Sequence, residues 1–201
     1  MNILEKSQER KKFKARKITI TGMLSSLLIM FGITGLGYIP IPIPPFHTTI
    51  MHIPVIIGSI LEGPIIGGFL GLIFGLTSMF QAIKSPTPVS FIFLNPLVSV
   101  LPRILIGITP WLTIKLLKVI KKGSLKIIIA TFIGSFTNTI GVLSAIYILY
   151  FYEYIRVLGI SEFAANSTFI ALTLNGFVSA GIAIAISLPV VSSIKKYKNR
   201  F

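Results

Sequence analysis

The 201-residue sequence contains no cysteine and no aspartate, and glutamate, which occurs five times, is its only acidic residue type. The absence of cysteine excludes disulfide bonds and thiolate metal sites. The two histidines, His47 and His52, have no carboxylate neighbour at metal-ligand spacing. The sequence also lacks a Gly-x-Ser-x-Gly nucleophile motif and a phosphate-binding loop. It therefore predicts neither an enzyme, nor a metal site, nor ATP hydrolysis by this chain.

Charge of either sign is scarce, because Asp, Glu, Lys and Arg make up 12% of the residues, against about 25% in soluble domains. Hydrophobic residues make up 53%, and the mean hydropathy is +0.89. So apolar a chain cannot cover a water-facing surface with polar groups. It is satisfied only where lipid is the solvent, so we predict an integral membrane protein.

The basic residues, which give a net charge of +14, are concentrated in three short segments. Seven of the nineteen precede the first apolar run, five lie in the middle of the chain, and four lie at its end. Short Lys/Arg-rich flanks stay on the cytoplasmic side of a membrane, so this pattern predicts orientation. A nucleic-acid partner is not favoured, because no basic groove or aromatic platform accompanies the charges. The residues are Lys6, Arg10, Lys11, Lys12, Lys14, Arg16, Lys17, Lys115, Lys118, Lys121, Lys122, Lys126, Lys195, Lys196, Lys198 and Arg200.

The apolar runs predict an all-α bundle of six transmembrane helices with both termini in the cytoplasm. The second helix is short, since about 13 residues rise only about 20 Å against a hydrocarbon core of about 30 Å. If it does not span, the even count fails. The predicted helices cover residues 18–37, 49–61, 65–83, 96–120, 125–151 and 167–193. The predicted regions are a basic cytoplasmic tail (1–17), a six-helix membrane domain (18–194) and a basic cytoplasmic C-terminus (195–201).

The connections between these helices carry clear breaking signals. Residues 38–46 contain four prolines and favour an extended segment. Residues 84–88 contain two more prolines, and residues 89–95 are expected to form a loop or to dip into the membrane edge. Residues 153–166 are expected to form a polar loop, with or without a short interfacial helix.

Polar side chains at membrane depth are costly and commonly functional. Arg103 lies about seven residues into the fourth predicted helix, or roughly 10 Å deep. It is either a cation for the carboxylate or phosphate of an anionic substrate, or an arginine that snorkels to the surface. Asn138 and Asn175 place amides inside the fifth and sixth helices. They either form interhelical hydrogen bonds or share a polar pocket with Arg103.

Other candidates lie near the predicted outer face or on the first helix. Asn95, His47 and Gln81 can line the mouth of such a pocket, although each alone is better explained as an ordinary loop or cap residue. Tyr147 belongs either to the interfacial aromatic belt or to a group that stacks on a ligand. Gly22 and Ser26 form a small-xxx-small pair, which serves either packing within the bundle or docking of a second protein.

The segment His52-Ile-Pro-Val-Ile-Ile-Gly-Ser-Ile-Leu-Glu-Gly-Pro64, which runs into Gly71-Leu-Ile-Phe-Gly-Leu-Thr-Ser78, resembles the substrate-binding S components of energy-coupling factor (ECF) transporters. The resemblance covers nearly the whole chain, including Leu101-Pro-Arg-Ile-Leu105 and Thr137-Asn-Thr139. Among subtypes the chain is most similar to the pantothenate type. Riboflavin-type members usually carry an Asp ahead of the Ile-Pro, where this chain has Met51-His52.

This resemblance implies a vitamin-binding subunit of the bacterial cell membrane. The outer halves of the fourth to sixth helices would form the pocket, covered by the first and third loops. The partners implied are a transmembrane coupling (T) subunit and two cytoplasmic ABC ATPases, which hydrolyse the ATP, so this chain needs no cofactor. The docking motif of the family, Ala-xxx-Ala, maps onto Gly22 and Ser26, neither of which is alanine. The predicted substrate-binding residues are Arg103, Asn138, Asn175, Asn95, His47, Gln81 and Tyr147.

Other cargoes and another transport mechanism remain open from the sequence. Within the same family, riboflavin or a pyrimidine precursor of thiamine are alternatives to pantothenate. A self-sufficient secondary transporter is a more distant alternative, because neither coupling-ion carboxylates nor inverted repeats with broken helices are evident.

Overall fold

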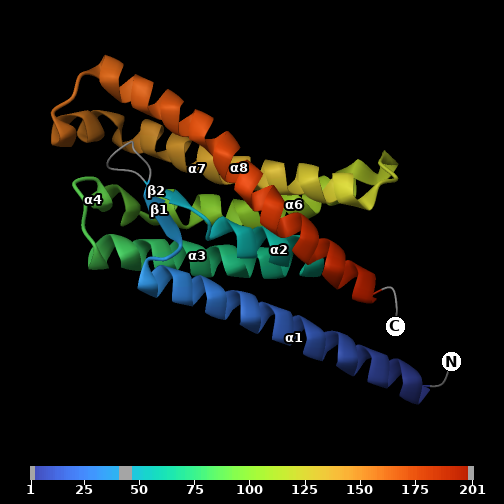
Figure 1. The fold of residues 1–201 in the computed structure, drawn as a ribbon. Helices are drawn as coiled ribbons and strands as arrows, with labels where there is room; N and C mark the ends of the chain where they lie inside the picture. The colour runs from blue at the N-terminus through green and yellow to red at the C-terminus, as the bar shows by residue number, and fades with distance from the viewer. Residues whose placement is uncertain (1–2, 41–46, 199–201) are drawn as a thin grey trace.

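The computed structural model of the chain describes residues 3–40 and 47–198, with side chains for residues 15–37 and 49–196. Helices make up nearly all of it (Figure 1). Among the described residues, five helical segments are long and apolar enough to cross a membrane, and one apolar helix is shorter. The elements are α1 (Ile3–Thr34), β1 (Tyr38–Pro40), β2 (His47–Thr49), α2 (His52–Glu62), α3 (Pro64–Lys84), α4 (Ser90–Phe93), α5 (Pro96–Ser99), α6 (Leu101–Leu116), η1 (Leu117–Val119), α7 (Gly123–Leu158) and α8 (Glu162–Lys198).

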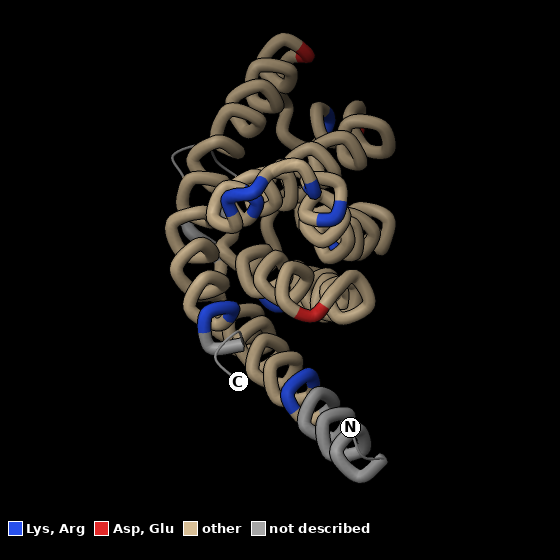
Figure 2. The backbone as a smooth tube through the Cα atoms, turned by 90° about the vertical axis from the view of Figure 1, so that its right-hand side faces the viewer, with Lys and Arg blue, Asp and Glu red and all other residues tan. Residues whose placement is uncertain are grey.

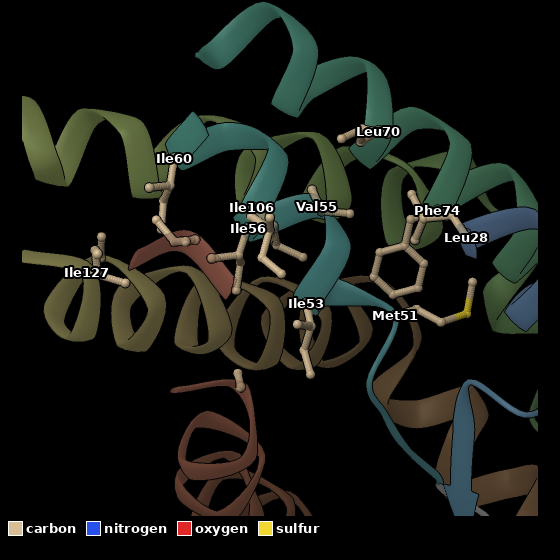
Figure 3. Close-up of a cluster of buried hydrophobic side chains, with 14 residues drawn as sticks. Leu28, Met51, Ile53, Val55, Ile56, Ile60, Leu70, Phe74, Ile106 and Ile127 are labelled. Atoms are coloured by element: carbon tan, nitrogen blue, oxygen red, sulfur yellow. The ribbon is translucent and has the colours of Figure 1, made fainter. Parts of the chain in front are cut away.

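Helix α2 lies at the centre of the bundle, in contact with α1, α3, α6, α7 and α8. Nine of its eleven residues, from His52 to Ile60, are buried. A helix that is apolar all round belongs inside a protein, not at its surface. Its shortness is therefore compatible with the membrane, because other helices cover it on all sides (Figure 3).

The chain reaches α2 through an antiparallel pair of short strands, in which Tyr38 lies opposite Thr49 and Pro40 opposite His47. The extended conformation expected for the proline-rich segment 38–46 is present in β1, while residues 41–46 lie outside the described residues. Gly35, at the end of α1, has φ +76°. This left-handed conformation, which glycine adopts at little cost, turns the chain from the helix into the first strand.

Glycines bring α3 and α6 into close backbone contact. A Cβ at Gly67, Gly71 or Gly75 would come within 3.0 Å of the backbone of α5 or α6. The three residues are spaced by four and therefore lie along one face of α3. Such small-xxx-small faces allow transmembrane helices to approach closely. This packing fixes the position of Arg103, because its carbonyl group is the one that a side chain at Gly71 would strike.

Several helix boundaries differ from the sequence prediction, and the predicted fourth helix (96–120) is divided into α5, α6 and η1. Helix α1 begins at Ile3, so the basic tail continues the first helix. Lys, Arg, Gln and Glu have high helix propensity, and no Gly or Pro interrupts the chain before Gly22. The polar loop predicted at residues 153–166 is wrong, since α7 and α8 are separated only by Gly159–Ser161. Gly159 ends α7 with φ +63°, and the Ser161 hydroxyl accepts a hydrogen bond from the Ala164 amide at the start of α8.

The segment between α3 and α6 is also more ordered than a loop. Residues 89–95 include the short helix α4 and are followed directly by α5. Val89 and Ile92 are buried in a second apolar cluster, together with Ile146 and Tyr154 of α7 and Phe169 of α8. The α4–α5 segment therefore packs on α7 and α8.

The two ends of the bundle differ in charge. The first end, which we call the basic end, carries the start of α1, the end of α8 and the α6–α7 connection (Figure 1). Most Lys and Arg residues gather there, as the view onto this end shows (Figure 2). The second end, which we call the hairpin end, carries the strand pair, α4 and the α7–α8 turn (Figure 1). Between the two ends the surface is apolar, with Ile65 and Ile148 each more than 75% exposed, as a lipid-facing surface requires.

Candidate functional site

Arg103 lies in the first turn of α6, where its side chain is 5% exposed. Its guanidinium lies over the Phe74 ring of α3, 5.4 Å from the ring centroid, and donates a hydrogen bond to the Val98 carbonyl. A cation over an aromatic face is stabilised by the ring quadrupole. The side chain is therefore held inside the protein, so the snorkelling alternative does not describe it.

Contacts between helices place the segment around Asn138 beside that of Arg103, and the segment around Asn175 beside that of Asn138. Gly141 of α7 packs on Pro102 of α6, the neighbour of Arg103. Thr139 of α7 packs against Gly176 of α8, the neighbour of Asn175. Antiparallel neighbours α6, α7 and α8 thus bring the three predicted residues to one region of the bundle.

Of the two amide side chains, Asn138 and Asn175, that of Asn138 has an oxygen atom without a hydrogen-bond partner. Its Oδ1 atom is buried and has no hydrogen-bond partner among the described residues. Buried polar atoms without a partner are uncommon and call for an explanation. A bound ligand that donates a hydrogen bond is one such explanation. Asn175 is half-buried, and it makes contacts of its own within the chain.

The other predicted residues occupy less central positions. Asn95 caps α5 by accepting from the Leu97 amide at 2.9 Å, and it donates to the Tyr150 hydroxyl at 2.9 Å. Gln81 lies at the contact between α1 and α3, with its Nε2 3.5 Å from the Ser85 hydroxyl and its Oε1 buried without a partner among the described residues.

Tyr147 and His47, the two remaining candidates, also lie toward the hairpin end. Tyr147 is 46% exposed and packs on Phe151 and Phe169, 4.5 and 5.5 Å between ring centroids. His47 lies in β2, and its side chain is outside the described ones. Their roles in substrate binding stay predictions.

Sequence reasoning missed a polar pair at the centre of the bundle. His52, the first residue of α2, is 1% exposed, and its Nε2 atom lies 3.2 Å from the hydroxyl of Ser135 on α7. The histidine was considered only as a metal ligand. Its place inside an otherwise apolar run was the signal that it faces other helices and not solvent.

On α1, the docking candidates face outward. A Cβ at Gly22 would meet no atom within 4 Å, and Ser26 is exposed, with its hydroxyl bonded to the Met23 carbonyl. The pair therefore does not serve packing within the described bundle.

Comparison with known proteins agrees with this architecture. Residues 16–194 match the family described as ECF transporter, substrate-specific component. The pantothenic acid transporter PanT of Lactococcus lactis subsp. cremoris is 34% identical over 157 residues, which cover 70% of this chain and 76% of that protein. The pantothenate transporter PanT of Leuconostoc mesenteroides is 35% identical over 94 residues, or 45% of this chain and 46% of that protein.

This family consists of transporter components and not of enzymes, and its members are multi-pass proteins of the bacterial cell membrane. The five long apolar helices fit that location. The chain belongs to the family of substrate-specific components of ECF transporters.

Proposed function

We propose that this chain captures pantothenate outside the cell as the S component of an ECF importer. The observation that carries the proposal is Arg103, a buried guanidinium held by α3 and α6, on a helix that packs against the helix bearing the neutral amide of Asn138. Pantothenate has a carboxylate at one end and hydroxyl and amide groups along the rest. An arginine suits a carboxylate, and side-chain amides suit the neutral groups. The two relatives named as pantothenate transporters support the same cargo.

The proposed topology has six passes, with both termini and the basic end in the cytoplasm. The strand pair and α2 together make the second pass, in which α2 covers only the part toward the basic end. The concentration of Lys and Arg at the basic end supports this orientation. Arg103, close to the hairpin end, then lies in the outer half of the membrane, where it can meet a substrate from outside.

Release of the substrate inside the cell would depend on partners. We propose that a transmembrane T subunit docks on the open face of α1 around Gly22 and Ser26, and that two cytoplasmic ABC ATPases drive the cycle. The absence of side chains around Gly22 leaves room for a second helix to approach.

A ligand screen on the purified chain tests the cargo. Thermal unfolding is followed with pantothenate, riboflavin and a thiamine-precursor pyrimidine. A ligand at 100 times its dissociation constant adds roughly 2.7 kcal/mol of stability, so a shift with pantothenate alone is expected. A shift with another vitamin would assign that cargo, and no shift with any of them would contradict the proposal.

A second experiment tests the coupling. Uptake of labelled pantothenate is measured in cells that carry the chain with or without the T subunit and the ATPases. We expect accumulation only with the complete set. Concentrative uptake without the ATPases would favour a secondary transporter.

A further inference from the structure

His52 of α2 and Ser135 of α7 form a hydrogen-bonded pair in the interior of the bundle. Both side chains are 1% exposed, and the ring Nε2 lies 3.2 Å from the hydroxyl oxygen. Both side chains belong to a part of the bundle where the neighbouring residues of α2 form the main apolar cluster. Polar side chains at such a place are commonly functional.

A third uncharged polar side chain follows this pair on α7. Asn138, with its unpartnered buried Oδ1, lies three residues after Ser135 on α7, one helical turn nearer the hairpin end. The His52 imidazole, the Ser135 hydroxyl and the Asn138 amide can each donate and accept hydrogen bonds without a full charge. Such a set suits hydroxyl and amide groups of a ligand better than it suits a carboxylate.

The spacing between this pair and Arg103 fits one extended molecule. Along α7, the contact with Pro102 lies at Gly141, six residues from Ser135, which is about 9 Å of helix rise. Pantothenate from its carboxylate to its terminal hydroxyl spans about eight bonds, or about 10 Å when extended at the length per bond of an extended chain. Along the helix axis, the separation between the level of Ser135 and the level of Pro102 therefore matches the length of the ligand.

We propose that His52 and Ser135 form the neutral end of the substrate site and bind the hydroxyl-bearing end of pantothenate, opposite the carboxylate at Arg103. This assignment rests on the proposed function. It makes the pair a determinant of specificity, since a site built to bond a hydroxyl group discriminates against ligands that lack it.

Calorimetric titration of the full chain in detergent tests the assignment. The ligands are pantothenate and N-(3,3-dimethylbutanoyl)-β-alanine, which is the same molecule without its two hydroxyl groups. The variants are Ser135→Ala and His52→Phe, with His52→Gln as a second choice if the aromatic replacement does not fold. Thr113→Val is the control, because Thr113 is another buried hydroxyl, lies toward the basic end of α6, and already donates to the Thr109 carbonyl. Thermal unfolding without ligand reports the stability of each variant separately.

We expect each variant of the pair to weaken pantothenate binding about tenfold, the loss of one hydrogen bond, and to leave the affinity for the dehydroxylated analogue unchanged. Thr113→Val should bind both ligands as the wild type does. Unchanged pantothenate affinity in both variants, or an equal loss for both ligands, would overturn the assignment while the proposed function stands. A wild-type chain that binds no pantothenate would overturn both.

Discussion

At the scale of single residues, the notable feature of this chain is a cationic side chain, Arg103, inside an apolar bundle, where burial of a charge costs free energy. Arg103 is retained inside the bundle by an aromatic face and one backbone carbonyl. A guanidinium has five donor hydrogens in a planar fork, and a carboxylate can take two of them at once. A lysine would supply the charge without that fork.

Replacement of Arg103 separates these contributions. We expect Arg103→Ala to weaken pantothenate binding about 10- to 100-fold, since hydrogen bonds to charged groups are worth about 1.5–3 kcal/mol. Arg103→Lys should retain part of the affinity. The alcohol analogue of pantothenate, which has no carboxylate, is the control and should bind wild type and Arg103→Ala alike in titration calorimetry. Equal pantothenate affinity in wild type and Arg103→Ala would remove the residue from the site.

A residue can be interpreted from the sequence when few structural roles account for that residue type at its position. Arg103 was predictable because few structural roles need an arginine at that depth. Asn95 was ambiguous, and the structure shows its side chain occupied as a helix cap and as a donor to Tyr150. His52 could not be paired with Ser135 in advance, because 83 residues separate them and only tertiary packing brings them together.

At the scale of helices, the contact between α3 and α6 determines where Arg103 sits. We expect Gly71→Ala to destabilise the protein by about 1–3 kcal/mol, the usual cost of overpacking, because the new Cβ would strike the Arg103 carbonyl. Gly68→Ala is the matched control on the same helix, since its nearest contact would be 3.9 Å. Thermal unfolding in detergent, followed by Trp111 fluorescence, compares the two. A Gly71→Ala protein as stable as the control would show that α6 can move away freely.

The ion pair between α1 and α2 allows a second test at this scale. Arg16 lies 3.2 Å from the Glu62 carboxylate, and the two side chains are 31% and 3% exposed. Loss of the partner leaves a buried carboxylate at a helix C-terminus, where the dipole disfavours it. We therefore expect Arg16→Ala to lower the unfolding temperature, and Arg16→Ala combined with Glu62→Gln to recover most of that loss. A double variant less stable than Arg16→Ala would contradict this interpretation of the pair.

Helix boundaries were the least predictable part of the fold. The apolar runs located the five long apolar helices and the shorter α2, but three of the helices continue beyond their apolar part. The residues after Tyr152 and before Ser167 contain Glu153, Glu162 and Asn166, which lower hydropathy without ending a helix. Only Gly159 and Ser161 provide an actual stop and start. Hydropathy therefore located the apolar part of each helix and not the residues at which the helix begins and ends.

At the scale of the whole molecule, one short helix determines the architecture. Because α2 is enclosed by five other helices, it does not need the length of a lipid-facing span. It also brings His52 to the centre of the bundle, where α7 can reach it. The proposed even number of passes then depends on the strand pair, which carries the chain from the end of α1 at the hairpin end to the start of α2.

The absence of native cysteine allows this topology to be measured directly. Ser85 and Ser161 are exposed at the hairpin end, and Ser124 is exposed at the start of α7, at the basic end. In intact cells, a membrane-impermeant maleimide should label Ser85→Cys and Ser161→Cys but not Ser124→Cys. Inside-out vesicles should reverse the pattern, and permeabilised cells should label all three. Labelling of Ser124→Cys together with Ser85→Cys in intact cells would mean that the chain crosses the membrane an even number of times between these positions. Helix α6 could then not be a complete pass, and the place of Arg103 in an outward-facing site would be lost.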